Sequence, residues 1–310
     1  MCMQTNRMRV AEMCRNKTTV ALVVVIVVLC CVLLFKEFRG PEERKFFVND
    51  NFQIEKDDVM NINDNFQIEK DDVTNMLIAQ RNNVSGALNL KQQKLGQLEC
   101  EKLQEKQGAT SKTGGWCKQT SREDSGAHMT DRKLVPALIE FFQGKYVASF
   151  GDGPGRYKQL LSDSGKLSGY DAYDGAPYCD ITSKGRVRFL DLTLPQYGLP
   201  LYDWVMSLEV AEHIPADFQS VYVDNIIRHA KEGIVLSWAR PGQGGYQHIN
   251  ERPFEYVVNL LDSLGFSHDK DTSEKLRNAA ELPWLRNNVN VYRRKTKYSD
   301  TFAGSPDVYL

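Results

Sequence analysis

The segment 146–155, YVASFGDGPG, constrains this chain most, because a short apolar run there ends in three closely spaced glycines. Gly151, Gly153 and Gly155 allow a tight turn and a close approach of the backbone to a ligand. Asp171 follows twenty residues after Gly151, where a second strand is expected to end. A strand, a glycine loop and a helix in this order are typical of parallel sheets that bind nucleoside-like cofactors at the loop.

Apolar and amphipathic segments alternate between residues 120 and 294. Strands are predicted at 146–150, 167–171, 187–191, 204–207 and 233–238, from 265 onward, and at 288–293, with helices at 131–143, 156–164, 216–230 and 252–263. Alternating strands and helices predict an α/β fold. We therefore expect a Rossmann-like, mostly parallel sheet with helices on both faces and a ligand at the carboxyl ends of the strands.

The chain before this domain has a different composition. A short tail, 1–17, precedes the apolar run Thr18–Phe35, which as a helix would span roughly 27 Å, close to a thin bilayer core. A transmembrane helix is predicted there. A cleaved signal peptide is the weaker alternative, because no small-residue cleavage signature follows. Residues 36–119 are predicted to form a polar stalk, in which NDNFQIEKDDV at 49–59 recurs at 63–73, a fourteen-residue duplication. The tail 295–310 is expected to be disordered.

The stalk also bears on oligomeric state. Heptad-like spacing favours a short coiled coil, whereas Gly86 and Gly96 argue against a strong one, so the oligomeric state stays open. The heptad positions are Leu77, Val84, Leu88, Leu95 and Leu98.

Membrane orientation is only weakly marked. Lys and Arg residues are equally frequent on the two sides of the apolar run, so the positive-inside rule does not choose between them. The glycosylation tripeptide Asn83-Val84-Ser85 favours a lumenal stalk and a type II protein of the ER or Golgi. A domain that faces the cytosol remains the alternative. On an oxidising side, Cys100–Cys117 is the preferred disulfide among three distal cysteines.

Five motifs in the domain resemble those of class I S-adenosylmethionine-dependent methyltransferases. They are VASFGDGPG at 147–155, GYDAYD at 169–174, VRFLDLT at 187–193, YDWVMSLEVAEHIP at 202–215 and GIVLSWA at 233–239. They occur in the order and spacing of that family, and the resemblance as a whole covers roughly residues 120–294. The resemblance implies an enzyme that uses S-adenosylmethionine as its cofactor.

The same resemblance implies a cofactor site. The loop residues Gly151, Asp152, Gly153 and Gly155 would hold the methionine part, Asp171 the ribose and Asp191 the adenine edge. The fourth-strand residues Ser207, Leu208 and Glu209 would line the wall beside the sulfonium. One departure is Ser149, where the family often carries an acidic residue, and Asp152 is the residue that could compensate.

Candidate catalytic residues follow the fourth and fifth strands. His213 comes directly after Glu212, and His248 lies in the glycine-rich segment GQGGYQHIN at 242–250. An imidazole with a pKa of about 6.5 is suited to general-base catalysis. The alternative for Glu212 and His213 is a structural role at the following turn, and that for His248 is a plain turn. No Cys/His spacing resembles a zinc site, so no metal ligand is predicted.

The predicted function is therefore a membrane-anchored methyltransferase that acts by in-line displacement on an unidentified acceptor, either a small molecule, a glycan or a protein. The net charge of −1 and the lack of a basic stripe argue against nucleic acid. A nicotinamide dehydrogenase is disfavoured, because Arg156 breaks the G-x-G-x-x-G pattern. The remaining alternative is a non-catalytic binding or scaffold protein on a degenerate methyltransferase fold, which Ser149 favours.

Overall fold

A computed structural model describes residues 56–103, 110–111, 115–117 and 128–296. The chain divides into two compact units, 1–63 and 64–310. Of the first unit, only the beginning of helix α2 (Lys56–Lys102) is described, and this helix continues into the second unit. The second unit contains the α/β domain, which is the subject of the following paragraphs.

The domain is built on one seven-stranded sheet with the order β3-β2-β1-β4-β5-β7-β6. Its strands are β1 (Tyr146–Phe150), β2 (Gly169–Asp174), β3 (Arg188–Phe189), β4 (Tyr202–Leu208), β5 (Ala230–Ser237), β6 (Phe266–Asp269) and β7 (Asn290–Arg294). The first five strands are parallel, and only β7 runs antiparallel to its neighbours β5 and β6. The strand order reverses between β1 and β4, and ligands of such sheets bind at this switch point.

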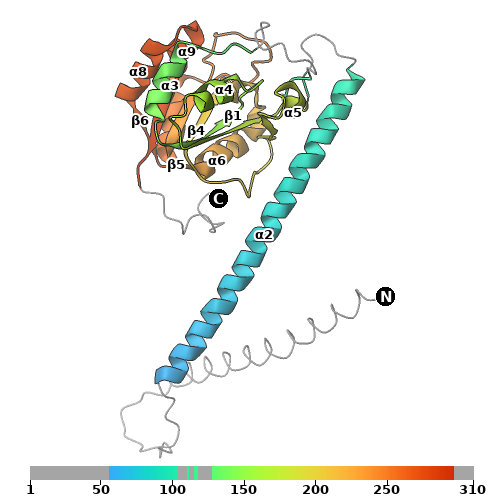
Figure 1. Cartoon of the computed structure of the whole chain (residues 1–310), viewed down its shortest axis with the longest axis vertical. Coiled ribbons are helices and arrows are strands. Elements are labelled where there is room, and N and C mark those ends of the chain that lie inside the picture. Colours follow the sequence, from blue (N-terminus) through green and yellow to red (C-terminus); the bar gives the residue numbers. More distant parts are fainter. Residues whose placement is uncertain (1–55, 104–109, 112–114, 118–127, 297–310) are drawn as a thin grey trace, which may run out of the picture. The chain divides into compact units, whose positions relative to one another are not determined.

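Helices cover both faces of the sheet (Figure 1). One apolar cluster packs α6 (Gln219–His229) and α7 (Phe254–Ser263) against one face. The other packs α3 (Leu134–Phe141), α4 (Arg156–Asp163), α8 (Lys270–Ala279) and α9 (Pro283–Asn288) against the opposite face. The short elements α5 (Cys179–Thr182), η1 (Ala211–His213) and η2 (Ala216–Phe218) lie in connections. The predicted Rossmann-like α/β fold is confirmed.

The central strands are apolar on both sides because each face carries a helical layer. In β4, the side chains of Trp204, Val205 and Met206 are all buried, although they alternate between the two faces. A strand that was covered on one face only would alternate with polar residues. The continuous run of buried residues in β4 therefore reflects the helical layers on both faces of the sheet.

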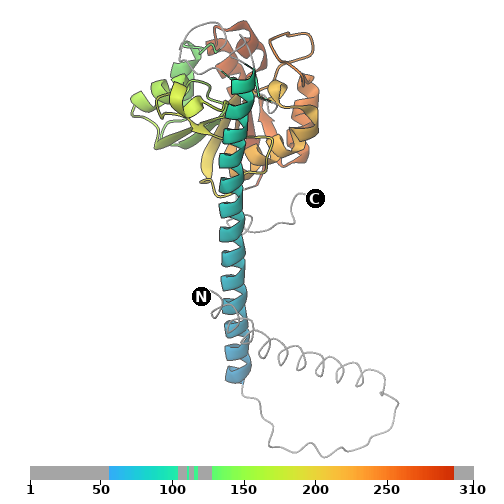
Figure 2. The same ribbon diagram turned by 90° about the vertical axis from the view of Figure 1, so that its right-hand side faces the viewer.

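The predicted polar stalk contains a long helix. Figures 1 and 2 show α2 as one continuous helix, and its 47 residues correspond to about 70 Å at 1.5 Å per residue. The five apolar residues at heptad spacing are exposed along it. None of the helices in the described ranges is long and apolar enough to cross a membrane. The predicted span Thr18–Phe35 and all but the first two residues of the predicted tail 295–310 lie outside the described residues.

Two local predictions can be compared with the structure. The Cys100–Cys117 disulfide is present, and Cys179 is a buried free thiol. The predicted second strand, 167–171, was placed too early, since β2 runs from Gly169 to Asp174. The acidic residue at its carboxyl end is therefore Asp174 and not Asp171. This shift changes the composition of the candidate site.

Candidate functional site

The loop between β1 and α4 lies at the switch point of the sheet. Gly151, Gly153 and Gly155 all have positive φ angles, of 98°, 57° and 81°. A Cβ atom on Gly151 would clash with the side chain of Val210, which follows β4, so the two segments approach closely. Gly155 is the N-cap of α4 and has no side chain that could occupy the helix N-terminus. The loop therefore brings backbone, and not side chains, to the ligand-facing edge.

Asp152 faces the interior of this loop. Its side chain is buried and accepts hydrogen bonds from the Tyr170 hydroxyl at 3.0 Å and from the Lys158 amide at 3.1 Å. A contact with Ser149 adds to these two. Burial raises the pKa of Asp152 to about 6, although the hydrogen bonds oppose this shift. Asp152 was predicted to contact the cofactor. In the structure its carboxylate makes hydrogen bonds inside the loop and to β2, and so supports the loop.

At the end of β2, Asp174 connects the strand to the glycine loop. Its Oδ2 accepts a hydrogen bond from the Gly153 amide at 2.8 Å, and its Oδ1 accepts one from the Ala176 amide at 2.8 Å. The side chain is only partly buried, so each carboxylate oxygen retains room for a further donor. This is the position from which an acidic residue reaches ribose hydroxyls in nucleoside-binding sheets.

Asp171 lies earlier in β2, opposite Ala148 of β1. Its Oδ2 accepts hydrogen bonds from the hydroxyls of Tyr146 at 2.7 Å and Tyr202 at 3.0 Å, and it pairs with Arg188 at 3.0 Å. Burial, and then the hydrogen bond to Asp171, raises the pKa of Tyr146 to about 12. The carboxylate predicted to bind ribose thus links β2 to β1, β3 and β4, and its role toward a cofactor stays a prediction.

Asp191, which follows β3, is 2% exposed. Its Oδ1 accepts hydrogen bonds from the Thr193 amide at 2.9 Å and the Thr193 hydroxyl at 2.7 Å. No hydrogen bond of normal geometry reaches its Oδ2, although Gln92 of α2 lies close by. Burial raises the pKa of Asp191 above its ordinary value. A buried acceptor without a donor is costly, so this oxygen is suited to a ligand N–H group.

Helix α2 contributes side chains next to Asp191. The amide group of Asn89 donates to Phe189 O at 2.9 Å and accepts from the Asp191 amide at 2.9 Å. Further along the helix, Gln93 and Gln97 both donate to Pro177 O, at 3.1 and 3.0 Å. These contacts hold the segments that follow β2 and β3. They were not predicted, because a polar helix carries no pattern that identifies its contact face.

The β4 residues predicted to line the cofactor have different surroundings. Ser207 is fully buried, donates to Phe150 O at 2.7 Å and meets the Tyr222 hydroxyl at 2.9 Å. Leu208 is half-buried against one apolar cluster. Glu209 has a positive φ of 55°, which is rare for a residue with a side chain. Ser207 therefore fixes the end of β1, and Glu209 marks a strained turn at the ligand-facing edge.

The carboxylate of Glu209 is bound by two amide side chains. Its Oε2 accepts a hydrogen bond from Gln243 at 2.8 Å, and its Oε1 accepts one from Asn288 at 3.1 Å. These partners come from the loop after β5 and from the end of α9. The contacts hold the strained turn in place from two directions.

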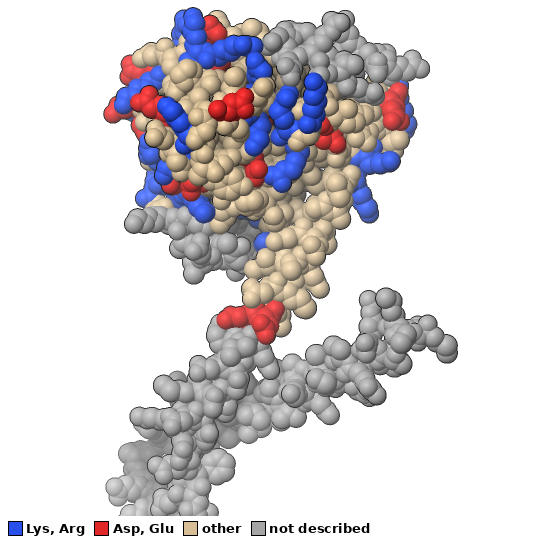
Figure 3. All heavy atoms as spheres, in the orientation of Figure 1, with Lys and Arg blue, Asp and Glu red and all other residues tan. Residues whose placement is uncertain are grey.

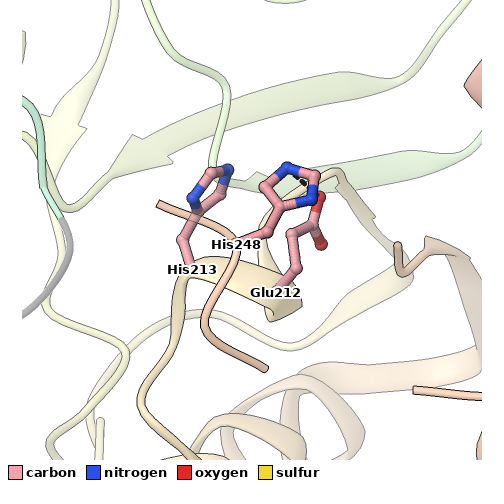
Figure 4. Close-up of side chains that lie close together, drawn as sticks. All are labelled: Glu212, His213 and His248. Atoms are coloured by element: carbon pink, nitrogen blue, oxygen red, sulfur yellow. Dashed lines mark ion pairs between the residues drawn. The ribbon is translucent and has the colours of Figure 1, made fainter. Parts of the chain in front are cut away.

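The three predicted catalytic residues meet one another (Figure 4). One ligand-type atom from each of Glu212, His213 and His248 lies within 4.8 Å of the other two. Glu212 is 0% exposed, and its Oε2 accepts a hydrogen bond from the Ala239 amide at 3.4 Å. Its Oε1 has no hydrogen-bond partner among the described residues and lies 3.9 Å from His248 Nε2. The sequence indicated these residues separately, and the fold brings them together.

The loop after β5 orients His248. Glu251 accepts hydrogen bonds from the amides of Gly242 at 2.9 Å and Gly244 at 3.1 Å, and its Oε1 lies 3.4 Å from His248 Nδ1. His213 is held in a similar way, with its Nδ1 3.2 Å from Gln247 O. Each histidine thus has an acceptor at Nδ1. Glu251 and the Gln247 carbonyl were not predicted, because loop closure creates both contacts.

Burial dominates the electrostatics of this group. It lowers the pKa of His213 to about 4, and His248 adds to the effect. Burial raises the pKa of Glu212 well above its ordinary value, and the charges of Glu209 and Glu251 raise it further. Both shifts favour the neutral forms of these side chains.

An aromatic group adjoins the histidines. Trp116 stacks on Tyr246 with a centroid distance of 5.6 Å and contacts the rings of His128 at 5.5 Å and His213 at 6.4 Å. Trp116 directly precedes Cys117, so the disulfide to the end of α2 restrains it. Trp116 was not predicted as a site residue, since it lies outside the predicted domain, 120–294.

Surface charge on the visible face is mixed. In Figure 3, Lys and Arg side chains occur together with Asp and Glu side chains over the domain. This mixture accords with the net charge of −1. The expectation that nucleic acid is not the partner stays a prediction.

Comparison with known proteins gives structural matches only. No family model matches the chain, and no curated protein matches it in sequence. Among solved structures, magnesium protoporphyrin IX methyltransferase (ChlM) from Synechocystis PCC 6803, with bound S-adenosylhomocysteine, is similar with a TM-score of 0.40 and 16% identity, over 55% of this chain and 90% of that chain. N-methyltransferase NodS from Bradyrhizobium japonicum WM9, also with S-adenosylhomocysteine, has a TM-score of 0.41 and 12% identity, over 53% and 85%.

Proposed function

We propose that the domain is an S-adenosylmethionine-dependent methyltransferase. The observation that carries this proposal is Asp191, a buried carboxylate at the carboxyl end of the sheet, whose Oδ2 receives no hydrogen bond of normal geometry from the described residues. An adenine amino group is a neutral N–H donor that would satisfy such an acceptor. When bound, S-adenosylmethionine supplies a methyl group that is already activated on a sulfonium centre.

The residues of the chain bind and orient in this proposal. The glycine loop and the N-terminus of α4 receive the carboxylate end of the cofactor. Asp174 takes the ribose role that the sequence analysis gave to Asp171, and Asp191 takes the adenine edge. Val210, two residues before Glu212, packs on Gly151 and so joins the loop to the segment that carries Glu212 and His213. Alignment of the reactants in such a site can contribute about 7–11 kcal/mol to catalysis in favourable cases.

The acceptor is expected beside Glu212, His213 and His248. These side chains follow β4 and β5, at the edge where ligands of such sheets bind. A histidine there can remove a proton from the acceptor as it attacks the methyl carbon. The chemical class of the acceptor is open between small molecule, glycan and protein.

Isothermal titration of S-adenosylmethionine into the full-length protein tests this function. Asp191→Asn keeps the size of the side chain but replaces one acceptor oxygen by a donor group. Because hydrogen bonds to charged groups contribute about 1.5–3 kcal/mol, we expect binding to weaken about 10- to 150-fold. Asp163→Asn, at an exposed position at the end of α4, is the matched control and should bind normally.

Absence of binding by the folded wild-type protein would refute the proposal and favour the scaffold alternative. Equal binding by wild type and Asp191→Asn would show that the cofactor, if bound, does not contact Asp191 as proposed. Circular dichroism of each variant establishes that it is folded.

We also propose a type II membrane topology, with Thr18–Phe35 as the anchor and the domain in the ER or Golgi lumen. The Cys100–Cys117 disulfide supports an oxidising compartment. Asn83 is exposed on α2, whereas Ser85 of the same tripeptide is buried and bonds to Pro195 O and to the Tyr197 amide. Attachment of a glycan would therefore have to precede folding. Since the cofactor is made in the cytosol, a lumenal domain also requires its import.

A mobility shift on glycosidase treatment of the full-length protein, absent in Asn83→Gln, is the expected result. The domain would face the cytosol if Asn83 is unglycosylated and if a protease added to the cytosolic side of intact membranes digests the domain.

A further inference from the structure

Glu212, His213 and His248 form a compact cluster, whereas general-base catalysis would require only one of the two histidines. Their ligand-type atoms lie within 4.8 Å of one another, although the residues come from two separate segments that follow β4 and β5 (Figure 4). The side chain of Glu212 is 0% exposed, and its Oε1 points into the group without a hydrogen-bond partner. A fully buried carboxylate oxygen in this state is destabilising unless something binds it.

The histidines are oriented as metal-binding histidines are. Metal-ligating imidazoles usually donate one ring N–H to a carbonyl or carboxylate and bind the ion through the other nitrogen. His213 Nδ1 lies 3.2 Å from Gln247 O, and His248 Nδ1 lies 3.4 Å from Glu251 Oε1. With Nδ1 directed at an acceptor, Nε2 is the nitrogen of each ring that could bind an ion, and His248 Nε2 faces Glu212 Oε1 at 3.9 Å.

The local charge also favours a cation. Glu209 and Glu251 flank Glu212, and their charges act on it. Within the described part of the chain, the Glu209 carboxylate receives neutral amide donors only, from Gln243 and Asn288. Among the ion pairs of the described residues, Glu212 has His248 alone, and that pair is longer than a hydrogen bond. Three acidic side chains therefore lie near the two imidazoles, an arrangement that a bound divalent ion would stabilise.

The backbone of the loop is strained where it delivers His248. Gln247 has a positive φ of 64° despite its side chain, and Gly245, with φ 150°, lies so close to the His248 ring that a Cβ atom there would clash. Such strain costs on the order of 1–3 kcal/mol at a residue with a side chain and persists where the surroundings impose it. Here it holds an imidazole against a buried carboxylate.

We infer that Glu212, His213 and His248 form a binding site for one first-row divalent metal ion, with nitrogen from both histidines and oxygen from the carboxylate as ligands. Two imidazoles and one carboxylate suit Zn²⁺, Mn²⁺, Fe²⁺ or Co²⁺ better than Mg²⁺ or Ca²⁺, which prefer oxygen ligands. Three protein ligands leave coordination positions open, unlike a closed four-ligand structural site. Glu251 and the Gln247 carbonyl are positioning groups. The site lies where the proposed function places the methyl acceptor, but ion binding does not depend on that function. A histidine that binds the ion through Nε2 is not available as the general base considered there.

Titration of Co²⁺ into full-length protein that has been stripped with a chelator tests the site. We expect one ion per chain, with a visible absorption band that Zn²⁺ abolishes by competition. Glu212→Gln and His248→Asn should each weaken binding about 100-fold or more, and Glu251→Gln about 10- to 100-fold, as for other outer-shell partners. Glu232→Gln and His268→Asn, which replace the same residue types elsewhere in the sheet, are the controls and should bind as wild type does.

Two outcomes would overturn the inference. One is the absence of stoichiometric Co²⁺ binding by folded wild-type protein, and the other is wild-type affinity in both Glu212→Gln and His248→Asn. If Glu212→Gln does not fold, His248→Asn decides, because His248 lies on a loop and is partly accessible. Titration of S-adenosylmethionine into the metal-free protein is a separate readout, so failure of the metal site and failure of the proposed function are distinguishable.

Discussion

Asp171 and Asp174 provide a direct test of how the site is built. Both are acidic residues of β2, and sequence reasoning gives the cofactor role to the first, whereas the structure favours the second. We compare Asp171→Ala with Asp174→Ala in the full-length protein. The two variants remove the same side chain from the same strand and differ only in their contacts.

Asp171→Ala is expected to lower stability. It removes the acceptor of the Tyr146 and Tyr202 hydroxyls, and hydrogen bonds to charged groups contribute about 1.5–3 kcal/mol each. Tyr202 keeps its bond to the Tyr173 hydroxyl, which reduces the loss. Arg188 is 57% exposed, so its ion pair adds less than about 1 kcal/mol. The sum is about 3 kcal/mol, or a Tm roughly 6–12 °C lower for a domain of this size.

Asp174→Ala is expected to lower cofactor affinity. The amides of Gly153 and Ala176 lose their acceptor but lie at a partly exposed turn, so the cost in stability is about 1 kcal/mol. Loss of the contacts to ribose hydroxyls should cost about 3 kcal/mol, which is roughly a 150-fold weaker affinity.

Thermal unfolding by circular dichroism and titration of S-adenosylmethionine, well below the Tm of both variants, separate the two effects. The reasoning is refuted if Asp171→Ala keeps its Tm and loses the cofactor, because the assignment from sequence would then be correct. It is also refuted if Asp174→Ala binds the cofactor as wild type does.

Three further predictions concern stability. Because burial raises the pKa of Asp152 to about 6 from 3.8, its proton stays bound to higher pH in the folded state, so stability falls as pH rises from about 4 to 6. Relative to Asp152→Asn, the free energy of unfolding of the wild type, measured by chemical denaturation, should fall by roughly 3 kcal/mol between these two pH values. A difference between the two proteins that does not change with pH would contradict this. Replacing both Cys100 and Cys117 by serine opens a loop with a sequence separation of 17 and should cost about 3 kcal/mol, measured against the oxidised protein in the same denaturant series. Gly151→Ala should lower the Tm more than Gly144→Ala, because both have positive φ but only Gly151 faces a neighbouring side chain, and equal effects would argue against the packing on Val210.

The sheet was largely predictable from sequence, because strands buried on both faces are short apolar runs between glycine-rich or polar turns. The end of β2 was not, since GYDAYD offers two acidic residues and both fit a strand that ends in Asp. Register with β1 decides between them. Phe150, the last residue of β1, pairs with Tyr173, which places Asp174 beside the glycine loop.

Glu212, His213 and His248 were each predicted as site residues, but their arrangement relative to one another was not. Glu212 and His213 are adjacent in sequence, whereas His248 reaches them only through a loop that Glu251 closes. Metal-ligand spacing in a sequence is recognisable when the ligands share one helix or one turn. Ligands that come from the ends of two neighbouring parallel strands have no fixed spacing, because the intervening helix can have any length.

The contacts of helix α2 with the domain could not be predicted from sequence either, because this segment reads as a polar stalk. Asn89 and Gln93 are polar residues in a polar sequence, so their hydrogen bonds to Phe189 O and Pro177 O leave no periodic signal. Yet Asn89 also binds the amide of Asp191, the residue that carries the proposed function. A fragment that begins after α2 would lose this contact and the Cys100–Cys117 disulfide together. Weak cofactor binding by such a fragment would therefore report the loss of α2 and not the absence of a site, which is why the binding experiments require the full-length chain.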